Sequence, residues 1–413
     1  MNKSPIFKLA DVTTLITDGK HGDSRDESGS GFFFLSSKDL RDGRLQYDDP
    51  REIKHDDFLE THRRTNLKPG DILLANCGAS IGRVGIAQRD ERICRTTFQK
   101  SISVIKANNK LIDSKYLYFY CLANSRHFVD LGGGTAQPNL LIGDLKRIKI
   151  HLPPFLVQKK ISAILSAYDE LIENNQRRIA LLEKMAEEIY REWFVRLRFP
   201  GHEMVKKVKG VPEGWRSMQF TEICAFQKGK TPDQTFLESQ DGLLPYITVE
   251  FIEGKNTEYV LKKRNSICCE NGDVLMLMDG ARSGLVFRGK KGIVGSTFAR
   301  VAVKPLYRDV VYEFLRATRE HIVSNNTGSA IPHANKEFIH RLMMFLPENE
   351  NLMEKFNAVY CSFFAQTLNL MNQNELLHRS RDALLPRLIS GKLSVENLDI
   401  QYPPGMEETA YAA

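Results

Sequence analysis

The sequence lacks the features that would anchor the chain in a membrane or staple it with disulfides. Its 413 residues contain no apolar run near the roughly 18 residues of a membrane-spanning helix, and the opening MNKSPIFKLADVTT has no apolar signal-peptide core. Seven cysteines are scattered without a Cys-x-x-Cys pair. An odd number at such spacings argues against a disulfide framework and a zinc site. We therefore expect a cytoplasmic protein with reduced thiols and no bound metal.

The signatures of nucleotide-binding and methyl-transferring enzymes are also missing or incomplete. The prolines of LPPF (residues 152–155) match an amino-methyltransferase motif, but Leu152 stands where a polar acceptor is needed. GKT (residues 229–231) resembles the end of a phosphate-binding loop, yet Cys224 occupies the place of the upstream glycine. The sequence therefore predicts no catalytic residue and no cofactor held by this chain.

One nuclease pattern stays open as an alternative. Asp233 after a proline, then Glu253 and Lys255, follows the order PD…ExK, in which two carboxylates hold Mg²⁺ and a lysine assists the attacking water. The surrounding TPDQTFLESQDG (residues 231–242) is typical of a loop, and FIEGKN (residues 251–256) is typical of a turn. A stand-alone Mg²⁺-dependent nuclease remains an alternative hypothesis.

The sequence does have a surplus of positive charge and a length that exceeds one ordinary core. Lys and Arg number 58 against 51 Asp and Glu, a net charge of +7, and 42% of the residues are hydrophobic. A basic surplus favours a polyanionic partner such as nucleic acid. A chain of this length is expected to divide into two or more domains.

Two stretches recur, in the same order, in the two halves of the chain. PGDILLANCGASIGRV (residues 69–84) aligns with NGDVLMLMDGARSGLV (residues 271–286). GTAQPNLLIGDLKRIKIHLP (residues 134–153) aligns with GSAIPHANKEFIHRLMMFLP (residues 328–347). An ordered series of matches indicates an internal duplication.

Each half mixes strand-like and helix-like patterns, which predicts two similar α+β domains. In the first half we expect strands at DILLA, RICRTTFQKSISVIKA and LKRIKIHL, and a helix at DSKYLYFYCLANSRHFVDL that begins near Asp113 or Ser114. In the second half we expect strands at DVLMLM, GIVGSTFARVAVK and HRLMMFL, and a helix at RDVVYEFLRATREHIVSN.

Each half ends in a long segment with seam residues at alternating steps of four and three, the a/d pattern of a coiled coil. The first seam is Ile161, Leu165, Tyr168, Ile172, Asn175, Ile179, Leu182, Ala186, Ile189 and Trp193. The second is Phe356, Tyr360, Phe363, Thr367, Leu370, Asn374, Leu377, Arg381, Leu384 and Leu388. Arg381 interrupts the second seam. Pro386 is expected to kink or end the helix, so the place of Leu388 stays open.

Connectivity predicts that the two helices pair in opposite directions. The first leads from domain one to domain two, and the second must run back to lie along it. About 33 residues at 1.5 Å each give a rod of roughly 50 Å. Asn175 and Asn374 are expected to fix the register, and Gly391 to cap the second helix. The alternative is that each helix packs only on its own domain.

These patterns divide the chain into five expected segments. They are a first globular domain (residues 1–155), a first spacer helix (156–199), a second globular domain (200–349), a second spacer helix (350–392) and a C-terminal tail (393–413).

This organisation resembles the specificity (S) subunits of type I restriction-modification systems over nearly the whole chain. The most specific pieces are VPEGW (211–215), GTAQPNL (134–140), LPPFLVQKKISAIL (152–165), LLEKMAEEIYREWF (181–194) and RDALLPRLISGKLSV (381–395). The first half lacks its own PEGW opening, and Leu352 and Ile331 replace the glutamines of the first copy. The resemblance implies a non-catalytic subunit whose two target recognition domains each read half of a bipartite site in double-stranded DNA.

The resemblance also implies partners. Two methyltransferase (M) subunits would dock on the paired helices and methylate adenine with S-adenosylmethionine. Restriction (R) subunits would add DNA cleavage that uses ATP and Mg²⁺, and no membrane would be involved. Outward-facing Ile164, Leu171 and Met185 would meet such partners or cover the domains. A coiled-coil adaptor with incidental basic charge stays a further alternative.

Candidate DNA contacts are cations for phosphates and amide, imidazole or cationic side chains for base edges. In the first half these are Lys20, His21, Arg63, Arg64, Arg83, Arg92, Arg95, Lys100, Gln137 and Asn139. In the second half they are Lys228, Lys230, Lys262, Lys263, Arg264, Arg282, Lys290, Lys291, His333, Asn335 and Lys336. For each, a solvated surface position is the alternative. The polar residues beside Pro138 and Pro332 can instead cap the next helix or strand.

Overall fold

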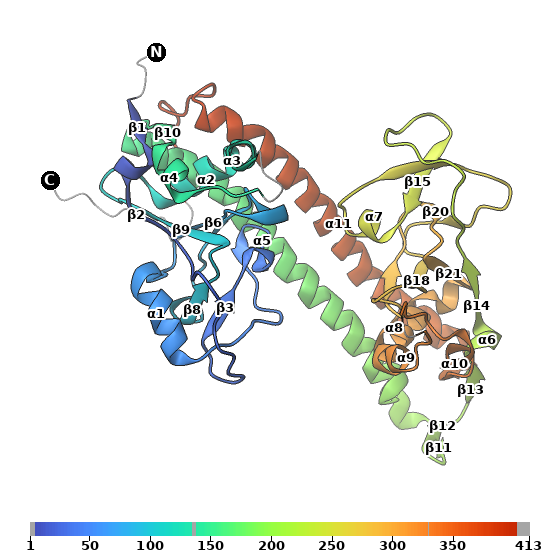
Figure 1. Cartoon of the computed structure of the whole chain (residues 1–413). Helices are drawn as coiled ribbons and strands as arrows, with labels where there is room; N and C mark the ends of the chain where they lie inside the picture. The colour runs from blue at the N-terminus through green and yellow to red at the C-terminus, as the bar shows by residue number, and fades with distance from the viewer. Residues whose placement is uncertain (1–4, 134–137, 329, 403–413) are drawn as a thin grey trace. The chain divides into compact units, whose positions relative to one another are not determined.

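The computed structural model describes residues 5–133, 138–328 and 330–402 (Figure 1). The chain forms two compact units: unit 1 is Met1–Gln176 with Asn372–Ala413, and unit 2 is Arg177–Met371. Both boundaries fall inside the long helices α5 (Phe155–Tyr190) and α11 (Glu350–Ile389). The compact units therefore cut across the five predicted segments, which stay a prediction. Within the described ranges, no helix has the length and apolarity needed to cross a membrane.

Unit 1 is built on an antiparallel four-stranded sheet in the order β2-β9-β6-β7. Its strands are β2 (Thr13–Asp18), β9 (Ile102–Ala107), β6 (Ile72–Ala75) and β7 (Val84–Ile86). The paired short strands are β1 (Ile6–Lys8) with β10 (Lys149–His151), β3 (Phe33–Leu35) parallel to β8 (Thr96–Phe98), and β4 (Leu40–Arg41) with β5 (Arg44–Leu45). The shorter helices are α1 (His55–Thr65), α2 (Ser114–Ala123), α3 (Ser125–Gly132) and α4 (Ile142–Arg147).

Unit 2 repeats this plan with the sheet order β14-β21-β18-β19. Its strands are β14 (Cys224–Lys228), β21 (Phe298–Val303), β18 (Val274–Leu277) and β19 (Val286–Arg288). A second sheet is β16 (Glu258–Leu261), β15 (Leu243–Ile247), β20 (Gly292–Val294) and β17 (Cys268–Cys269), with β15 parallel to β20. The remaining pairs are β13 (Trp215–Gln219) with β22 (Met343–Pro347) and β11 (Lys207–Val208) with β12 (Val211–Pro212). The shorter helices are α6 (Phe220–Ile223), α7 (Val249–Ile252), α8 (Arg308–Ala317), α9 (Arg319–Ser324) and α10 (Lys336–His340).

The two units share both strand order and pairing sense, so the predicted α+β class and internal duplication are confirmed. Some predicted boundaries are wrong. LKRIKIHL was predicted as one strand. In the structure Leu145 belongs to helix α4 and is fully buried, and only Lys149–His151 forms a strand. The helix N-cap is Asp113, whose carboxylate accepts the Tyr116 amide. Helix α1 was not predicted at all.

Both cores include residues of the long helices. In unit 1, Ile161 and Leu165 of α5 and Leu388 of α11 join the residues packed on the sheet. In unit 2, Tyr190 of α5 and Phe356 of α11 do the same. The helices pair with each other and also pack on the globular parts, so the alternative that each helix packs only on its own domain is wrong. Ile164 belongs to the packed side, whereas Leu171 and Met185 are about half exposed.

Within each unit the helix halves run antiparallel (Figure 1). In unit 1, Asp169 contacts Arg381 at 2.6 Å and Asn175 contacts Asn374 at 2.9 Å, so later residues of α5 meet earlier residues of α11. In unit 2, the ring of Trp193 lies 5.8 Å from that of Phe356. Every residue of both predicted seams is buried or half-buried.

The expectation that Pro386 would end the second helix is wrong, and a kink at this residue stays a prediction. Helix α11 continues to Ile389, and Leu388 is 2% exposed in the core of unit 1. Proline removes one hydrogen bond to the carbonyl four residues earlier, here that of Asp382. Asp382 is exposed, so water reaches its backbone, and burial of Leu388 favours the helix. The helix ends where predicted, at Gly391, which has φ +72° and donates its amide to Leu388.

Unit 2 holds a buried polar network between the sheet and the long helix α11. The Arg288 guanidinium lies 2.8 Å from the Asp309 carboxylate and donates to the Tyr360 hydroxyl at 2.9 Å. That hydroxyl donates to Glu313 at 2.6 Å, and burial raises the pKa of the Glu313 carboxyl. The guanidinium also stacks on the Tyr312 ring at 3.9 Å. Charge pairing therefore adds to the apolar core of unit 2 at the contact between strand β19, helix α8 and helix α11.

The corresponding positions of unit 1 follow from the shared strand and helix registers. Where unit 2 has Arg288, Glu313 and Tyr360, the repeat places Ile86, Phe119 and Leu165 in unit 1. Phe119 and Leu165 are at most 1% exposed. The second copy thus replaced apolar contacts with ionic ones at the same place in the fold.

We expect the Asn175–Asn374 pair to set register at the expense of stability. Asn374→Leu leaves the Asn175 amide buried and unpaired, so the free energy of unfolding of unit 1 should fall by about 1–3 kcal/mol. The double variant Asn175→Leu/Asn374→Leu should be at least as stable as the original chain, because two leucines fill a dry seam. Urea unfolding followed by far-ultraviolet circular dichroism measures this. Exposed Asn372→Leu is the control. Equal losses in the single and double variants would contradict the pairing.

We expect Arg288→Ala to destabilise unit 2 by about 3–5 kcal/mol, because the carboxylate of Asp309 stays buried without its main cation. Arg282→Ala, which breaks a surface pair with Glu253, should lose at most about 1 kcal/mol. Tryptophan fluorescence during urea unfolding reports unit 2 alone, since both tryptophans, Trp193 and Trp215, lie there. Equal effects of the two arginine substitutions would refute the network.

Candidate nucleic-acid interface

Three chain segments meet at one end of the four-stranded sheet in unit 1. They are the end of β2 (residues 18–21), the turn after β6 (residues 76–80) and the proline loop (residues 138–140). The Gly78 amide donates to the carbonyl of Pro138 at 3.1 Å, and the Leu140 amide to that of Asn76 at 2.7 Å. We call this junction the three-loop site of unit 1.

Unit 2 has the same junction, formed by the end of β14 (residues 228–230), the turn after β18 (residues 278–283) and a second proline loop (residues 330–334). The Gly280 amide donates to Pro332 at 2.9 Å, and the Ala334 amide to Met278 at 2.8 Å. These bonds match those of unit 1 one for one. Three pairs of positions are therefore equivalent: Asp18 and Lys228, Cys77 and Asp279, Asn139 and His333.

A close crossing of two backbones requires glycine in both three-loop sites. A Cβ on Gly19 would lie 2.2 Å from the carbonyl oxygen of Phe98, and one on Gly229 would lie 2.2 Å from that of Gly295. Real side chains do not approach backbone this closely. The glycines thus allow the segments with Lys20 and Lys230 to cross the neighbouring strand ends.

The three-loop site of unit 1 surrounds a cavity of about 290 Å³. The predicted residues His21, Lys100 and Asn139 line it together, with Asp18 and Cys77. His21 Nε2 lies 2.8 Å from the Asp18 carboxylate. Burial raises the pKa of the Cys77 thiol, so this sulfur stays protonated at neutral pH. The site combines one carboxylate, two amides (Asn76 and Asn139), an imidazole and the exposed Lys100.

The three-loop site of unit 2 holds a different set of side chains. The Asp279 carboxylate contacts Lys228 Nζ at 2.7 Å and His333 Nδ1 at 2.8 Å. Partial burial disfavours its ionised form, but hydrogen bonds from Lys228 and His333 outweigh this and lower the pKa of Asp279. Lys228 and His333 keep 41% and 50% of their side chains exposed. Asp279 therefore holds two accessible side chains in place.

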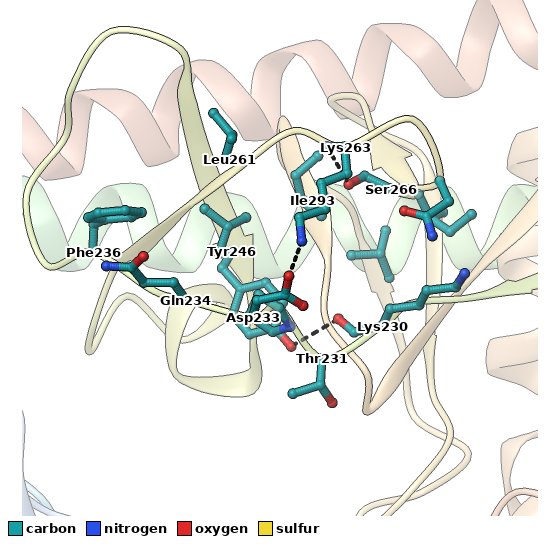
Figure 2. Close-up of a pocket in the computed structure, with 15 residues that line it drawn as sticks. Lys230, Thr231, Asp233, Gln234, Phe236, Tyr246, Leu261, Lys263, Ser266 and Ile293 are labelled. Carbon is teal, nitrogen blue, oxygen red and sulfur yellow. Dashed lines mark hydrogen bonds and ion pairs between the residues drawn. The ribbon is translucent and has the colours of Figure 1, made fainter.

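A second cavity of unit 2, about 330 Å³, lies beside this site (Figure 2). Its lining includes Lys230 from the segment after β14 and Lys263 from the loop between β16 and β17. Lys263 pairs with Asp233 across the cavity. Exposed Lys262 and Arg264 are on the same loop. The fold thus brings two of the predicted cations of unit 2, Lys230 and Lys263, to one concave surface.

In unit 1, helix α1 stands at the same point of the topology as this loop. Phe58 of α1 stacks between Phe32 at 4.8 Å and His62 at 4.6 Å. Glu60 accepts a hydrogen bond from Lys20 at 2.9 Å. Lys20 is therefore held by helix α1 of unit 1. Its counterpart in unit 2, Lys230, is exposed and forms no ion pair within the described ranges.

Other predicted contacts lie apart from these surfaces or have structural roles. Among the candidates of unit 1, Arg64 donates to the carbonyls of Asp18 and Gly19, and Arg92 pairs with Asp90. Arg63, Arg83 and Arg95 are exposed, and Gln137 lies outside the described residues.

Among the candidates of unit 2, Asn335 accepts the amide of Phe338 and caps α10, as the alternative for proline-loop residues anticipated. Arg282 pairs with Glu253, and Lys290 lies over the ring of Phe251. Lys291 and Lys336 are exposed.

The structure does not assemble the proposed nuclease residues. Glu253 binds Lys255 at 2.5 Å and also Arg282, and these hydrogen bonds lower its pKa. Asp233 pairs with Lys263 in a cavity that neither Glu253 nor Lys255 lines. Among the residues that the structure describes, no group of three or more His, Cys, Asp or Glu side chains is placed to hold a metal ion. Asp233 and Glu253 thus lie in separate ion pairs, which does not favour a shared metal site.

Sequence reasoning missed Asp18, Cys77 and Asp279 because the search for DNA contacts favoured cations. The alignment of the two repeats could have identified two of them, because Cys77 and Asp279 are aligned and each directly precedes a glycine, Gly78 or Gly280. All seven cysteines fall in the described part of the chain and are free thiols.

We expect Gly19→Ala and Gly229→Ala each to destabilise their own unit by about 1–3 kcal/mol or more, because the added methyl meets rigid backbone oxygens. Gly143→Ala in α4, which meets nothing closer than 4.0 Å, should be neutral or stabilising. Circular dichroism follows unit 1, and tryptophan fluorescence follows unit 2. A tolerated Gly229→Ala would show that the crossing is not close.

A family model matches the two halves of this chain separately, in agreement with the duplication. The family model described as "Type I restriction modification DNA specificity domain" matches residues 1–184 and again 212–377. The type I restriction enzyme MjaIX specificity subunit of Methanocaldococcus jannaschii is 25% identical over 358 residues, 80% of this chain and 79% of that protein. The HindI specificity subunit of Haemophilus influenzae is 23% identical over 216 residues, 50% of this chain and 44% of that one.

A solved structure agrees with the fold. The S subunit of a type I restriction-modification system from M. genitalium aligns with a TM-score of 0.54 at 16% identity, covering 94% of this chain and 97% of that one. The resemblance inferred from the sequence is confirmed: two family-model matches cover most of the chain, and the chain belongs to the type I restriction-modification DNA specificity family.

Proposed function

We propose that this chain is the DNA-recognition subunit of a type I restriction-modification complex, with each unit reading one half of a bipartite double-stranded target. The observation that carries the proposal is the pair of three-loop sites. They share a backbone scaffold but differ in the side chains at three equivalent pairs of positions: Asp18 and Lys228, Cys77 and Asp279, Asn139 and His333. Similar scaffolds with unlike side chains are suited to two half-sites of different sequence.

Partner subunits supply the chemistry in this proposal. M subunits bring S-adenosylmethionine and methylate adenine, and R subunits bring ATP- and Mg²⁺-dependent translocation and cleavage, all in the cytoplasm. The helices support docking because apolar side chains stay exposed on them. In unit 2 these are Leu181 (61%) and Met185 on α5, and Leu368 and Met371 (47%) on α11. Exposed apolar groups at helical spacing are typical of a surface that awaits a partner.

Salt-dependent binding separates this proposal from a coiled-coil adaptor with incidental charge. For the full chain bound to its M subunit, the logarithm of the binding constant for double-stranded DNA should fall linearly with the logarithm of the salt concentration. An adaptor would show little sequence preference and no requirement for the M subunit. The same assay with Mg²⁺ and the chain alone tests the nuclease alternative through DNA cleavage.

We expect Lys230→Ala to weaken DNA binding uniformly across sequences and to reduce the salt slope by about one counterion, because its free ammonium is placed for a phosphate. Lys20→Ala should change the slope less, since that ammonium already contacts Glu60 at 2.9 Å. Fluorescence anisotropy with labelled duplex at several salt concentrations measures both.

The control is Lys355→Ala, an exposed lysine on α11 with the same charge change. The proposal that Lys230 contacts phosphate is wrong if Lys230→Ala and Lys355→Ala give the same slope. DNA binding that is absent in the unaltered complex at every salt concentration would contradict the function itself.

A further inference from the structure

The equivalent positions of the two three-loop sites carry opposite chemistry. Unit 1 has the carboxylate of Asp18 where unit 2 has the ammonium of Lys228. It has the neutral thiol of Cys77 where unit 2 has the carboxylate of Asp279. The matched backbone hydrogen bonds of the two turns make this a comparison of equivalent places. The duplication therefore exchanged a hydrogen-bond acceptor for a donor at one reading position.

In unit 2, Asp279 fixes both of its neighbours. Lys228 Nζ uses one donor on Asp279 Oδ2 at 2.7 Å, which leaves two N–H groups free. His333 Nδ1 lies 2.8 Å from Asp279 Oδ1, so the Nδ1–H tautomer of the ring donates to this carboxylate and keeps Nε2 as an acceptor. The site thus presents donors and an acceptor side by side, both attached to one partly buried carboxylate.

This combination matches one base pair in the major groove. Guanine presents N7 and O6 as acceptors, and the cytosine paired with it presents the N4 amino group as a donor. The ammonium of Lys228 complements the guanine edge, and Nε2 of His333 complements the cytosine amino group. Without Asp279, both side chains would be free to rotate and Lys228 would serve equally well on a phosphate.

Unit 1 presents the reverse pattern at the same place. Asp18 is an acceptor-only group held by His21 at 2.8 Å, and Asn139 is the neighbour across the cavity. Carboxylates accept from cytosine N4, and asparagine pairs with adenine N6 and N7. The equivalent position of unit 1 therefore favours cytosine or adenine over guanine.

We propose that Asp279 is a positioning residue that gives unit 2 a preference for a G·C pair by holding Lys228 and His333, and that Asp18 gives unit 1 a preference for cytosine or adenine at the equivalent position. The inference rests on the proposed DNA-recognition function and adds the base chemistry of each half-site. Asp279 acts through its two partners and makes no contact with DNA in this arrangement.

The test uses the full chain assembled with its M subunit and a pool of duplexes randomised over both half-sites. Bound DNA is sequenced, and base preference at every position is compared with the unaltered complex. Asp279→Asn should reduce the preference for guanine at one position of one half-site by about fivefold or more and leave the other half-site unchanged. The exchange Lys228→Asp/Asp279→Cys, which installs the unit 1 residues, should move that preference from guanine to cytosine or adenine.

Two controls separate base reading from charge and from folding. Asp241→Asn makes the same charge change at an exposed turn of unit 2 and should leave all preferences unchanged. Asp18→Asn should alter only the other half-site. Tryptophan fluorescence establishes that unit 2 is folded in each variant.

The outcomes distinguish the two levels of inference. An unaltered complex that selects no sequence would overturn the proposed function. A selective complex in which Asp279→Asn changes affinity evenly, without altering any base preference, would overturn the positioning role and assign Lys228 to a phosphate.

Discussion

The structure depends on one packing constraint: each long helix contributes buried side chains to the cores of both units. The first turns of α5 bury Ile161 and Leu165 in unit 1, and its last turn buries Tyr190 in unit 2. Helix α11 does the reverse with Phe356 and Leu388. A shift of either helix by one residue would remove apolar side chains from both cores together. The buried Asn175–Asn374 hydrogen bond adds a polar penalty for any such slip, because a shifted register leaves both amides unpaired.

Duplication preserved the backbone of the two units and let their interactions diverge. Sheet order, the parallel strand pair and the three-loop junction are the same in both. The contact between sheet and long helix is apolar in unit 1 but rests on Arg288, Asp309 and Tyr360 in unit 2. Beside the three-loop site, unit 1 has helix α1, whose Glu60 binds Lys20, whereas unit 2 has a cavity lined by Lys230 and Lys263. Divergence of this kind allows one scaffold to present two surfaces.

Much of the architecture was predictable because its signals are periodic or repeated. The seam residues follow from heptad steps, and every one of them is buried or half-buried. Strand DILLA and the Asp113 N-cap follow from local patterns. Pro386 misled because its local effect is small beside the burial of Leu388, which depends on the tertiary core. Helix α1 was missed because its apolar residues are few and its stability comes from contacts such as Phe58 with Phe32.

The candidate site was less accessible to sequence reasoning. Lys228, Asp279 and His333 are separated by about fifty residues at each step, and only the folded sheet brings them together. Counting cations found Lys228 and His333 but passed over the carboxylate between them. It also could not tell that Lys20 is held by Glu60, whereas Lys230 is exposed and has no ion pair with any residue that the structure describes.

The junction of loops in each unit is closed by main-chain hydrogen bonds, such as Gly78 to Pro138 and Gly280 to Pro332. No substitution of a neighbouring side chain removes such a bond. Mutations at Asp18, Cys77, Lys228 or Asp279 can therefore accumulate while the junction keeps its shape. Under the proposed function, single substitutions at these positions would change the base preference of one half-site while the junction of that unit keeps its main-chain hydrogen bonds.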